Sequence, residues 1–227
     1  MNTAEIRNIL VVRQHDQLGD MLCAVPLLRT LRINFPSASI SLVASPVNYQ
    51  IMLHNPFADE VLNYDKRDFF PGLHNTWRFY RKLRSRRYDL VVVPATVSIS
   101  RTSNMMALLS GARIRVGPGI LQGRKNSSSF CFNTLVNLDW TSEPRRHQTL
   151  RNLDILQPLG ITTNELTCPI GFSSEEIRSA EVILQQMRSK HTLIIGMHPG
   201  AGKQANCWDA EKFAAVANRL SQEHGAG

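Results

Sequence analysis

The chain has 227 residues, of which 43% are hydrophobic, enough to bury one substantial core or one full domain and part of another. A formal net charge of +8 favours anionic partners such as phosphates, nucleic acid or an acidic membrane surface, although many soluble enzymes are also basic. The four cysteines are widely spaced without a CxxC pair, and no run of about 18 apolar residues lacks a charge, which argues against a zinc site of clustered cysteines and a membrane-spanning helix. Because no signal-peptide core is seen either, we expect a soluble cytoplasmic protein with reduced cysteines.

The first informative stretch is the apolar run Ile9–Val12, which leads through the turn Arg13–Asp20 into the amphipathic segment Met21–Phe35. A strand that runs through a glycine-containing turn into a helix places the turn at the carboxyl end of a sheet, where open α/β folds bind ligands. Asp20 is therefore a candidate for chemistry. Its alternative role is that of a helix cap or surface turn residue.

Apolar, β-branched runs recur along the chain and alternate with segments of helical period. The predicted strands are Ile9–Val12, Ile40–Ala44, Val61–Tyr64, Leu90–Pro94, Ile114–Val116 and Leu193–Met197. The predicted helices are Pro26–Phe35, Tyr49–His54, Thr76–Arg87, Ser103–Leu109, His147–Gln157, Ser174–Lys190 and Ala210–His224. This alternation predicts an α/β fold with a doubly wound parallel sheet.

Three connecting segments stand out between these elements. Gly117–Ser129 is rich in Gly, Ser, Lys and Arg and predicts a mobile loop, and Thr141–Arg146 predicts a connector. Ile161–Ser173 is polar and contains proline, so it is the best candidate for a domain boundary. We expect domains at 1–170 and 171–227, the second of them incomplete, because few elements remain after the boundary.

The basic segment Trp77–Arg87 contains six cations beside three aromatic residues. It is suited to anionic lipid headgroups or to a phosphorylated substrate. We favour the alternative of an ordinary helix, in which Trp77, Tyr80 and Leu83 line the core and the cations are solvated.

The last motif is a glycine-rich loop, His198-Pro199-Gly200-Ala201-Gly202-Lys203, after the predicted strand Leu193–Met197. Glycines let backbone N–H groups approach a phosphate, and lysine adds a compensating charge, so a nucleotide diphosphate fits there. The spacing is not that of a Walker A loop, and Gly19 belongs to no GxGxxG fingerprint, which disfavours a nicotinamide dehydrogenase. An ordinary strand-to-helix turn is the alternative.

Three segments together resemble the heptosyltransferases of lipopolysaccharide synthesis, glycosyltransferase family 9. They are LVVRQHDQLGDMLCAVPLLRTLRINFP, ISLVASPVNYQIMLHNPFADEVLNYD and IIGMHPGAGKQANCWDAEKFAAVANRL. The resemblance implies a GT-B architecture, in which an N-terminal Rossmann-like domain holds the acceptor and a second Rossmann-like domain holds the nucleotide sugar. It also implies inverting, metal-independent transfer of heptose from an ADP-heptose-like donor to the lipopolysaccharide inner core, without a cofactor.

The resemblance also assigns roles to residues. Asp20 matches the family's catalytic base, and the region His198–Lys203 matches its phosphate-binding region. An acceptor hydroxyl needs a carboxylate to take its proton, and a departing diphosphate needs N–H groups and a cation, here Gly200, Ala201, Gly202 and Lys203. The family's usual lysine before the tryptophan is absent from Asn206-Cys207-Trp208, and Lys203 is the candidate to replace it.

Other residues compete with Asp20 or complement it. His15 and Asp16 lie within five residues of Asp20 and are alternatives for its role. Gly19, Arg67 and Arg101 are candidates for acceptor binding, because arginines just beyond strand ends can pair with an acidic sugar through both arms of the guanidinium.

The leading hypothesis is therefore a cytoplasmic glycosyltransferase, in peripheral contact with the inner-membrane surface, that binds a nucleotide sugar and an anionic lipopolysaccharide core but not nucleic acid. The alternative is a truncated module of the same family that binds the acceptor or serves assembly without catalysis.

Overall fold

The structure, a computed structural model, describes residues 5–14, 17–69 and 73–227. The chain divides into two compact units, Met1–Gly171 and Phe172–Gly227, and each unit is described by itself. Within the described residues, no helix is both long enough and apolar enough to span a bilayer.

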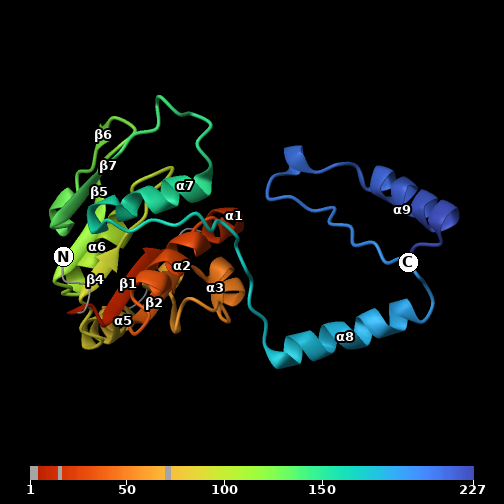
Figure 1. The fold of residues 1–227 in the computed structure, drawn as a ribbon, viewed down its shortest axis with the longest axis horizontal. Helices are drawn as coiled ribbons and strands as arrows, with labels where there is room; N and C mark the ends of the chain where they lie inside the picture. Colours follow the sequence, from red (N-terminus) through yellow and green to blue (C-terminus); the bar gives the residue numbers. More distant parts are fainter. Residues whose placement is uncertain (1–4, 15–16, 70–72) are drawn as a thin grey trace. The chain divides into compact units, whose positions relative to one another are not determined.

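The first unit is built on a sheet that contains seven strands among the described residues, in the order β3-β2-β1-β4-β5-β6, with β7 paired to β5 (Figure 1). The strands are β1 Asn8–Arg13, β2 Ser39–Ala44, β3 Glu60–Asn63, β4 Leu90–Val92, β5 Ile114–Leu121, β6 Arg124–Lys125 and β7 Thr134–Leu138. Every pairing is parallel except that of β5 with β6, so the carboxyl ends of β1 to β5 share one edge of the sheet. The predicted doubly wound α/β fold is confirmed.

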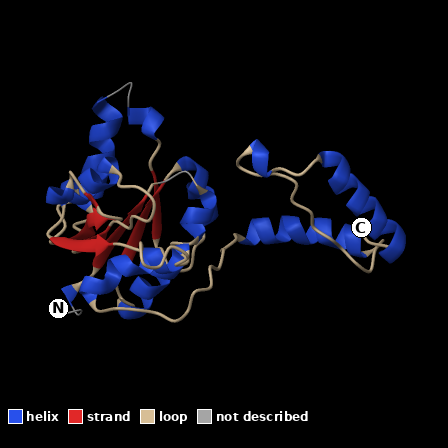
Figure 2. Ribbon diagram, turned by 90° about the horizontal axis from the view of Figure 1, so that it is seen from above, coloured by secondary structure: helices blue, strands red, loops and turns tan. Residues whose placement is uncertain are grey.

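Helices cover both faces of this sheet (Figure 2). They are α1 Leu18–Leu22, α2 Val25–Asn34, α3 Pro46–Met52, α4 Lys66–Phe69, α5 Leu73–Ser85, α6 Arg101–Leu109, η2 Ser129–Cys131, α7 Gln148–Leu153 and η3 Asp154–Leu159. Side chains alternate along β1, so that Ile9 and Val11 join the core under α2 and η3 while Leu10 and Val12 join the core under α5 and α6. All four are at most 1% exposed, and each such buried side chain contributes about 1.5–3 kcal/mol to folding.

The prediction of a mobile loop over Gly117–Ser129 is wrong. Gly117–Leu121 continues β5, and Gln122 and Gly123, both with positive φ (49° and 73°), form a two-residue connection to β6. Two consecutive residues in the left-handed region make the turn type that joins antiparallel strands in a tight hairpin. The strand β7, which pairs with β5, was not predicted at all.

The basic helix α5 packs on the sheet through one face. Leu83 is fully buried and Tyr80 partly, as expected. The expectation that Trp77 lines the core is wrong, because its side chain is 57% exposed and the Arg81 guanidinium stacks on its ring, 4.8 Å from the centroid.

The second unit contains the helices α8 Ser174–Arg188, η4 Gln204–Asn206 and α9 Ala210–His224. Ser173 and Glu176 form a reciprocal capping box at the start of α8, and Gly225 ends α9 in the left-handed region. The predicted strand Leu193–Met197 is wrong, since in this fully described unit Leu193 makes only an isolated bridge to Ala226. Figure 2 draws this unit without a strand. A strand requires a partner ladder, and the apolar run finds none here.

Candidate functional site

The order of the strands creates a topological switch point at the carboxyl edge of the first unit. From β1 the chain winds outward to β2 and β3, and then returns to the other side of β1 to form β4 and β5. Connections leave β1 and β4 in opposite directions, and ligands of open α/β folds bind at this kind of switch point. The segments that follow β1, β3 and β4 carry the candidate residues of this unit.

Asp20 lies in the first turn of α1, the first helix after β1. The N-cap of this short helix is Gln17, not Asp20, so the structure does not give Asp20 the capping role. Its side chain is half-buried and has no hydrogen-bond or ion-pair partner among the described residues. The neighbouring Gly19 is exposed, with open space where a Cβ would stand. The competing residues His15 and Asp16 lie outside the described residues.

Arg13 is a buried cation at the end of β1, 3% exposed. Its Nη2 donates to Thr96 Oγ1 at 3.4 Å, and the same hydroxyl accepts a 2.5 Å bond from Nε2 of Gln148 in α7. The Arg13 Nε has no partner, and no ion pair found among the described residues includes this guanidinium. Burial lowers the pKa of Arg13, an effect that the nearby negative charge of Asp20 opposes. The candidate base thus has a buried cation on the preceding strand.

Gln14 points toward α6, whereas Arg13 points toward α7. Its Nε2 donates to Ser100 Oγ at 2.8 Å and to Ser103 Oγ at 3.2 Å, while Ser100 also caps α6 by accepting from the Ser103 backbone N–H. Gln14 is 1% exposed and its Oε1 has no partner. These bonds fix the segment after β4 against the end of β1.

The two candidate acceptor arginines lie beyond strands on either side of β1. Arg67, in α4, follows β3 and forms a bidentate pair with Asp65, in which the shortest bond is 2.8 Å. Hydrogen bonds from the side chain and the backbone of Arg67 hold the pKa of Asp65 below its ordinary value. Both residues line an open cavity of about 330 Å³ at this edge. Arg101 begins α6 and donates to Ser127 Oγ at 3.3 Å.

The two arginines are not brought into one cluster. Three strand spacings, roughly 14 Å, separate β3 from β4, so Arg67 and Arg101 stand at separate points of the edge. Asp20 follows β1, and β1 lies between β3 and β4 in the sheet. The arrangement suits an extended acidic substrate better than a single small anion.

In the second unit, the loop His198–Lys203 is exposed and precedes α9. Gly202 has open space around its Cα, and a Cβ on Gly200 would meet only the His198 ring, at 3.6 Å. The backbone of Lys203 is extended, and its side chain forms no ion pair within this fully described unit. Cys207 Sγ donates to the Lys203 carbonyl at 3.7 Å and so holds the end of the loop. Accessible backbone and a free ammonium group are what a diphosphate requires.

The arrangement allows acid–base chemistry at the edge of the sheet, where a half-buried carboxylate lies near a buried cation. No three His, Cys, Asp or Glu side chains gather as a possible metal site in the described part of the chain.

Sequence reasoning missed Arg13, Gln14, Thr96 and Gln148. The one available signal was the position of Arg13-Gln14 directly after the run Ile9–Val12, where the chain continues the strand. Thr96 and Gln148 offered no such signal, because only the packing of α7 against the sheet brings them to Arg13.

Comparison with known proteins places these features in context. The family model described as Glycosyltransferase family 9 (heptosyltransferase) matches residues 76–226. The chain is 27% identical to lipopolysaccharide heptosyltransferase 3 of Escherichia coli K12 over 212 residues, a match that covers 90% of this chain and 57% of that protein. It therefore spans little more than half the length of this curated relative.

Two solved structures share the fold. The glycosyl transferase family 9 protein of Veillonella parvula superposes with a TM-score of 0.79 at 22% identity, covering 95% of this chain and 60% of that one. The Escherichia coli ADP-heptose lps heptosyltransferase II gives 0.68 at 22% identity, covering 95% and 62%.

Proposed function

The chain belongs to glycosyltransferase family 9, and from this premise we propose that it acts in transfer of heptose from ADP-heptose to the inner core of lipopolysaccharide. The names of the two Escherichia coli relatives, a lipopolysaccharide heptosyltransferase and an ADP-heptose heptosyltransferase, support the donor and acceptor classes. The acceptor is an anionic glycolipid, so the proposed place of action is the cytoplasmic face of the inner membrane, with contact at the surface only.

In the proposed reaction, Asp20 is the general base. The oxygen of an acceptor hydroxyl attacks the anomeric carbon, its proton passes to the Asp20 carboxylate, and the bond from the anomeric carbon to the diphosphate oxygen breaks. The electron pair leaves with ADP, and attack from the opposite side inverts the configuration. The Arg13 guanidinium and the Asp20 carboxylate attract each other, because the charge of Asp20 opposes the lowering of the Arg13 pKa by burial.

The proposed donor site is the loop His198–Lys203. Backbone N–H groups of Gly200, Ala201 and Gly202 would hold the diphosphate, and the Lys203 ammonium would balance the charge that develops on it, so no metal is needed. His198 is the first residue of this loop. Lys203 would replace the lysine that the family carries before its tryptophan, where this chain has Asn206-Cys207-Trp208.

The observation that carries the proposal is the half-buried Asp20 carboxylate, unpartnered among the described residues, at the switch point of the sheet. The test is to incubate the purified chain with ADP-heptose and a lipopolysaccharide core acceptor and to quantify ADP. Release of ADP that depends on the acceptor supports the proposal. Acceptor binding without ADP release contradicts it.

That contrary result would favour the second candidate, a module that binds the acceptor without catalysis. One observation favours it: the second unit, although described throughout, has no strand, and Ala226 is its single buried residue. Calorimetry with ADP separates the two functions, because only a chain with a working donor site binds the nucleotide.

A further inference from the structure

A second cavity lies away from Asp20, beside the edge strand β3. Its volume is about 470 Å³. It is lined by Tyr49 of α3, by Val61, Leu62 and Asn63 of β3, by Asp65, and by Asn75, Arg78, Phe79 and Lys82 of α5. β3 ends the sheet and β2 separates it from β1, the strand that Asp20 follows; the cavity shares Asp65 with the cavity that Arg67 lines.

The cavity carries positive charge that its own acids do not neutralise. Lys82 pairs with Glu60 at 3.3 Å, but Glu60 also accepts a shorter 2.7 Å bond from Arg86. Asp65 is engaged by Arg67. Arg78 has no ion pair or hydrogen bond in the described part of the chain. One guanidinium and a shared ammonium, one helical turn apart, are therefore available to an anion.

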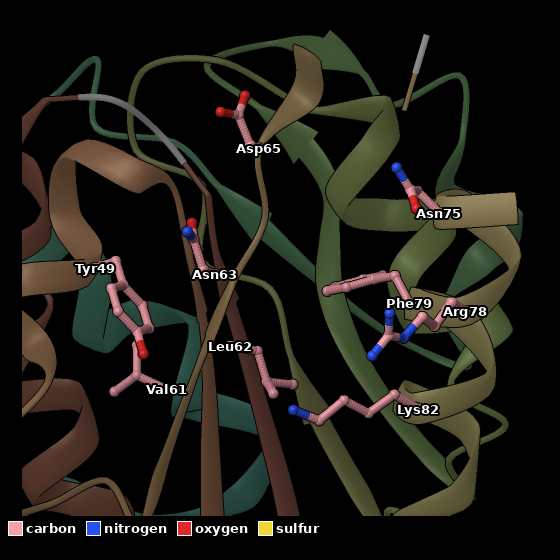
Figure 3. Close-up of a pocket in the computed structure, with 9 residues that line it drawn as sticks. All are labelled: Tyr49, Val61, Leu62, Asn63, Asp65, Asn75, Arg78, Phe79 and Lys82. Carbon is pink, nitrogen blue, oxygen red and sulfur yellow. The ribbon is translucent and has the colours of Figure 1, made fainter. Parts of the chain in front are cut away.

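The remaining lining suits a sugar. Figure 3 shows Arg78, Phe79 and Lys82 reaching from α5 toward β3, with Tyr49 on the other side of that strand. The Phe79 ring is held by Tyr64 and Tyr80, at centroid distances of 5.2 and 5.6 Å. Asn63, Asn75 and the Tyr49 hydroxyl add donors and acceptors of the kind that sugar hydroxyls need, and an aromatic ring offers an apolar surface for the face of a sugar.

We propose that this cavity binds an acidic sugar, with its phosphate or carboxylate on Arg78 and Lys82 and its hydroxyls on Tyr49, Asn63 and Asn75. A guanidinium pairs with either anion through two parallel N–H bonds, and the two sources share this chemistry. One part of the proposal rests on the proposed function: that the sugar is a unit of the acceptor, remote from the hydroxyl that reacts.

Calorimetry on the whole chain tests the site with glucose 6-phosphate, glucuronate, glucose and inorganic phosphate. We expect an acidic sugar to bind at least about tenfold more tightly than glucose and than inorganic phosphate, because charge-assisted bonds and hydroxyl contacts then act together. The better ligand of the two acidic sugars identifies the anion. Equal binding of inorganic phosphate, or no binding of either acidic sugar, would overturn the proposal.

Variants locate the site. Arg78→Gln and Lys82→Gln should each weaken binding of the better acidic sugar by about tenfold. Arg81→Gln is the matched control, because Arg81 lies on the same helix but stacks on Trp77 instead of lining the cavity. An equal loss in Arg81→Gln would show a general effect of helix charge and contradict the site. The assay contains no donor, so a failure of heptose transfer leaves its result unchanged.

Discussion

The Nη2 of Arg13 lies 3.4 Å from Oγ1 of Thr96, where β1 and β4 end side by side. This is a long hydrogen bond for a guanidinium that is 3% exposed, and Nε of the same group has no partner. Burial of a charge costs free energy unless it is paired, so a cation retained here is better explained by what it does for Asp20 and an anionic substrate than by stability.

Arg13→Met should therefore separate stability from function. We expect the free energy of unfolding, measured with urea, to stay within about 1 kcal/mol of the parent or to rise, because methionine fills the space without a charge to desolvate. Acceptor-dependent release of ADP should fall at least about tenfold. A loss of several kcal/mol of stability with unchanged transfer would contradict this interpretation.

Asp20→Asn tests the base. The amide has the same shape but cannot accept the proton, so transfer should fall by about 10²–10⁴-fold. Because no described residue bonds to the Asp20 side chain, stability and acceptor affinity should change little. Quench-flow or steady-state measurement of ADP, together with calorimetry of acceptor binding, checks both points. The control is the same substitution at an exposed aspartate, Asp139→Asn. Asp59→Asn is not suitable as a control, because Asp59 forms an ion pair with Arg32.

The central strands could be predicted from sequence because burial on both faces leaves continuous apolar runs such as Ile9–Val12. The hairpin at Gln122–Gly123 and the strand β7 could not, because their pairing with β5 depends on partners that composition does not reveal. The run Leu193–Met197 failed for the opposite reason: its composition is that of a strand, but its unit provides no ladder.

The candidate site could be predicted from sequence only in part. Asp20 follows a recognisable strand and turn, whereas the contact of Thr96 with both Arg13 and Gln148 joins three segments that are distant in sequence. Local patterns indicate at which edge of the sheet a site is expected. Only packing determines which buried polar groups support it.

Gly117→Ala tests the corrected account of β5. A Cβ at this position would lie 2.2 Å from the ring of Phe132, which is only 6% exposed, so the strand or the ring must shift. We expect a loss of about 1–3 kcal/mol in urea unfolding, the usual cost of overpacking. Gly119→Ala in the same strand is the control, because its nearest contact is 3.2 Å, and it should cost less. Equal stability of Gly117→Ala and the parent would contradict the ordered packing.

Alkaline pH should destabilise the face of the sheet covered by α5. Burial, with a smaller effect of Tyr64, raises the pKa of Tyr80 from 10.0 to about 12, and burial also raises the pKa values of Tyr64 and Tyr88. The folded state keeps these phenols neutral while the unfolded state ionises near pH 10, so their contribution is complete below pH 10 and is lost as the pH rises toward 12. The free energy of unfolding should therefore fall between pH 10 and pH 12, and by less in Tyr80→Phe. The same decrease in both proteins would show that Tyr80 does not contribute to it.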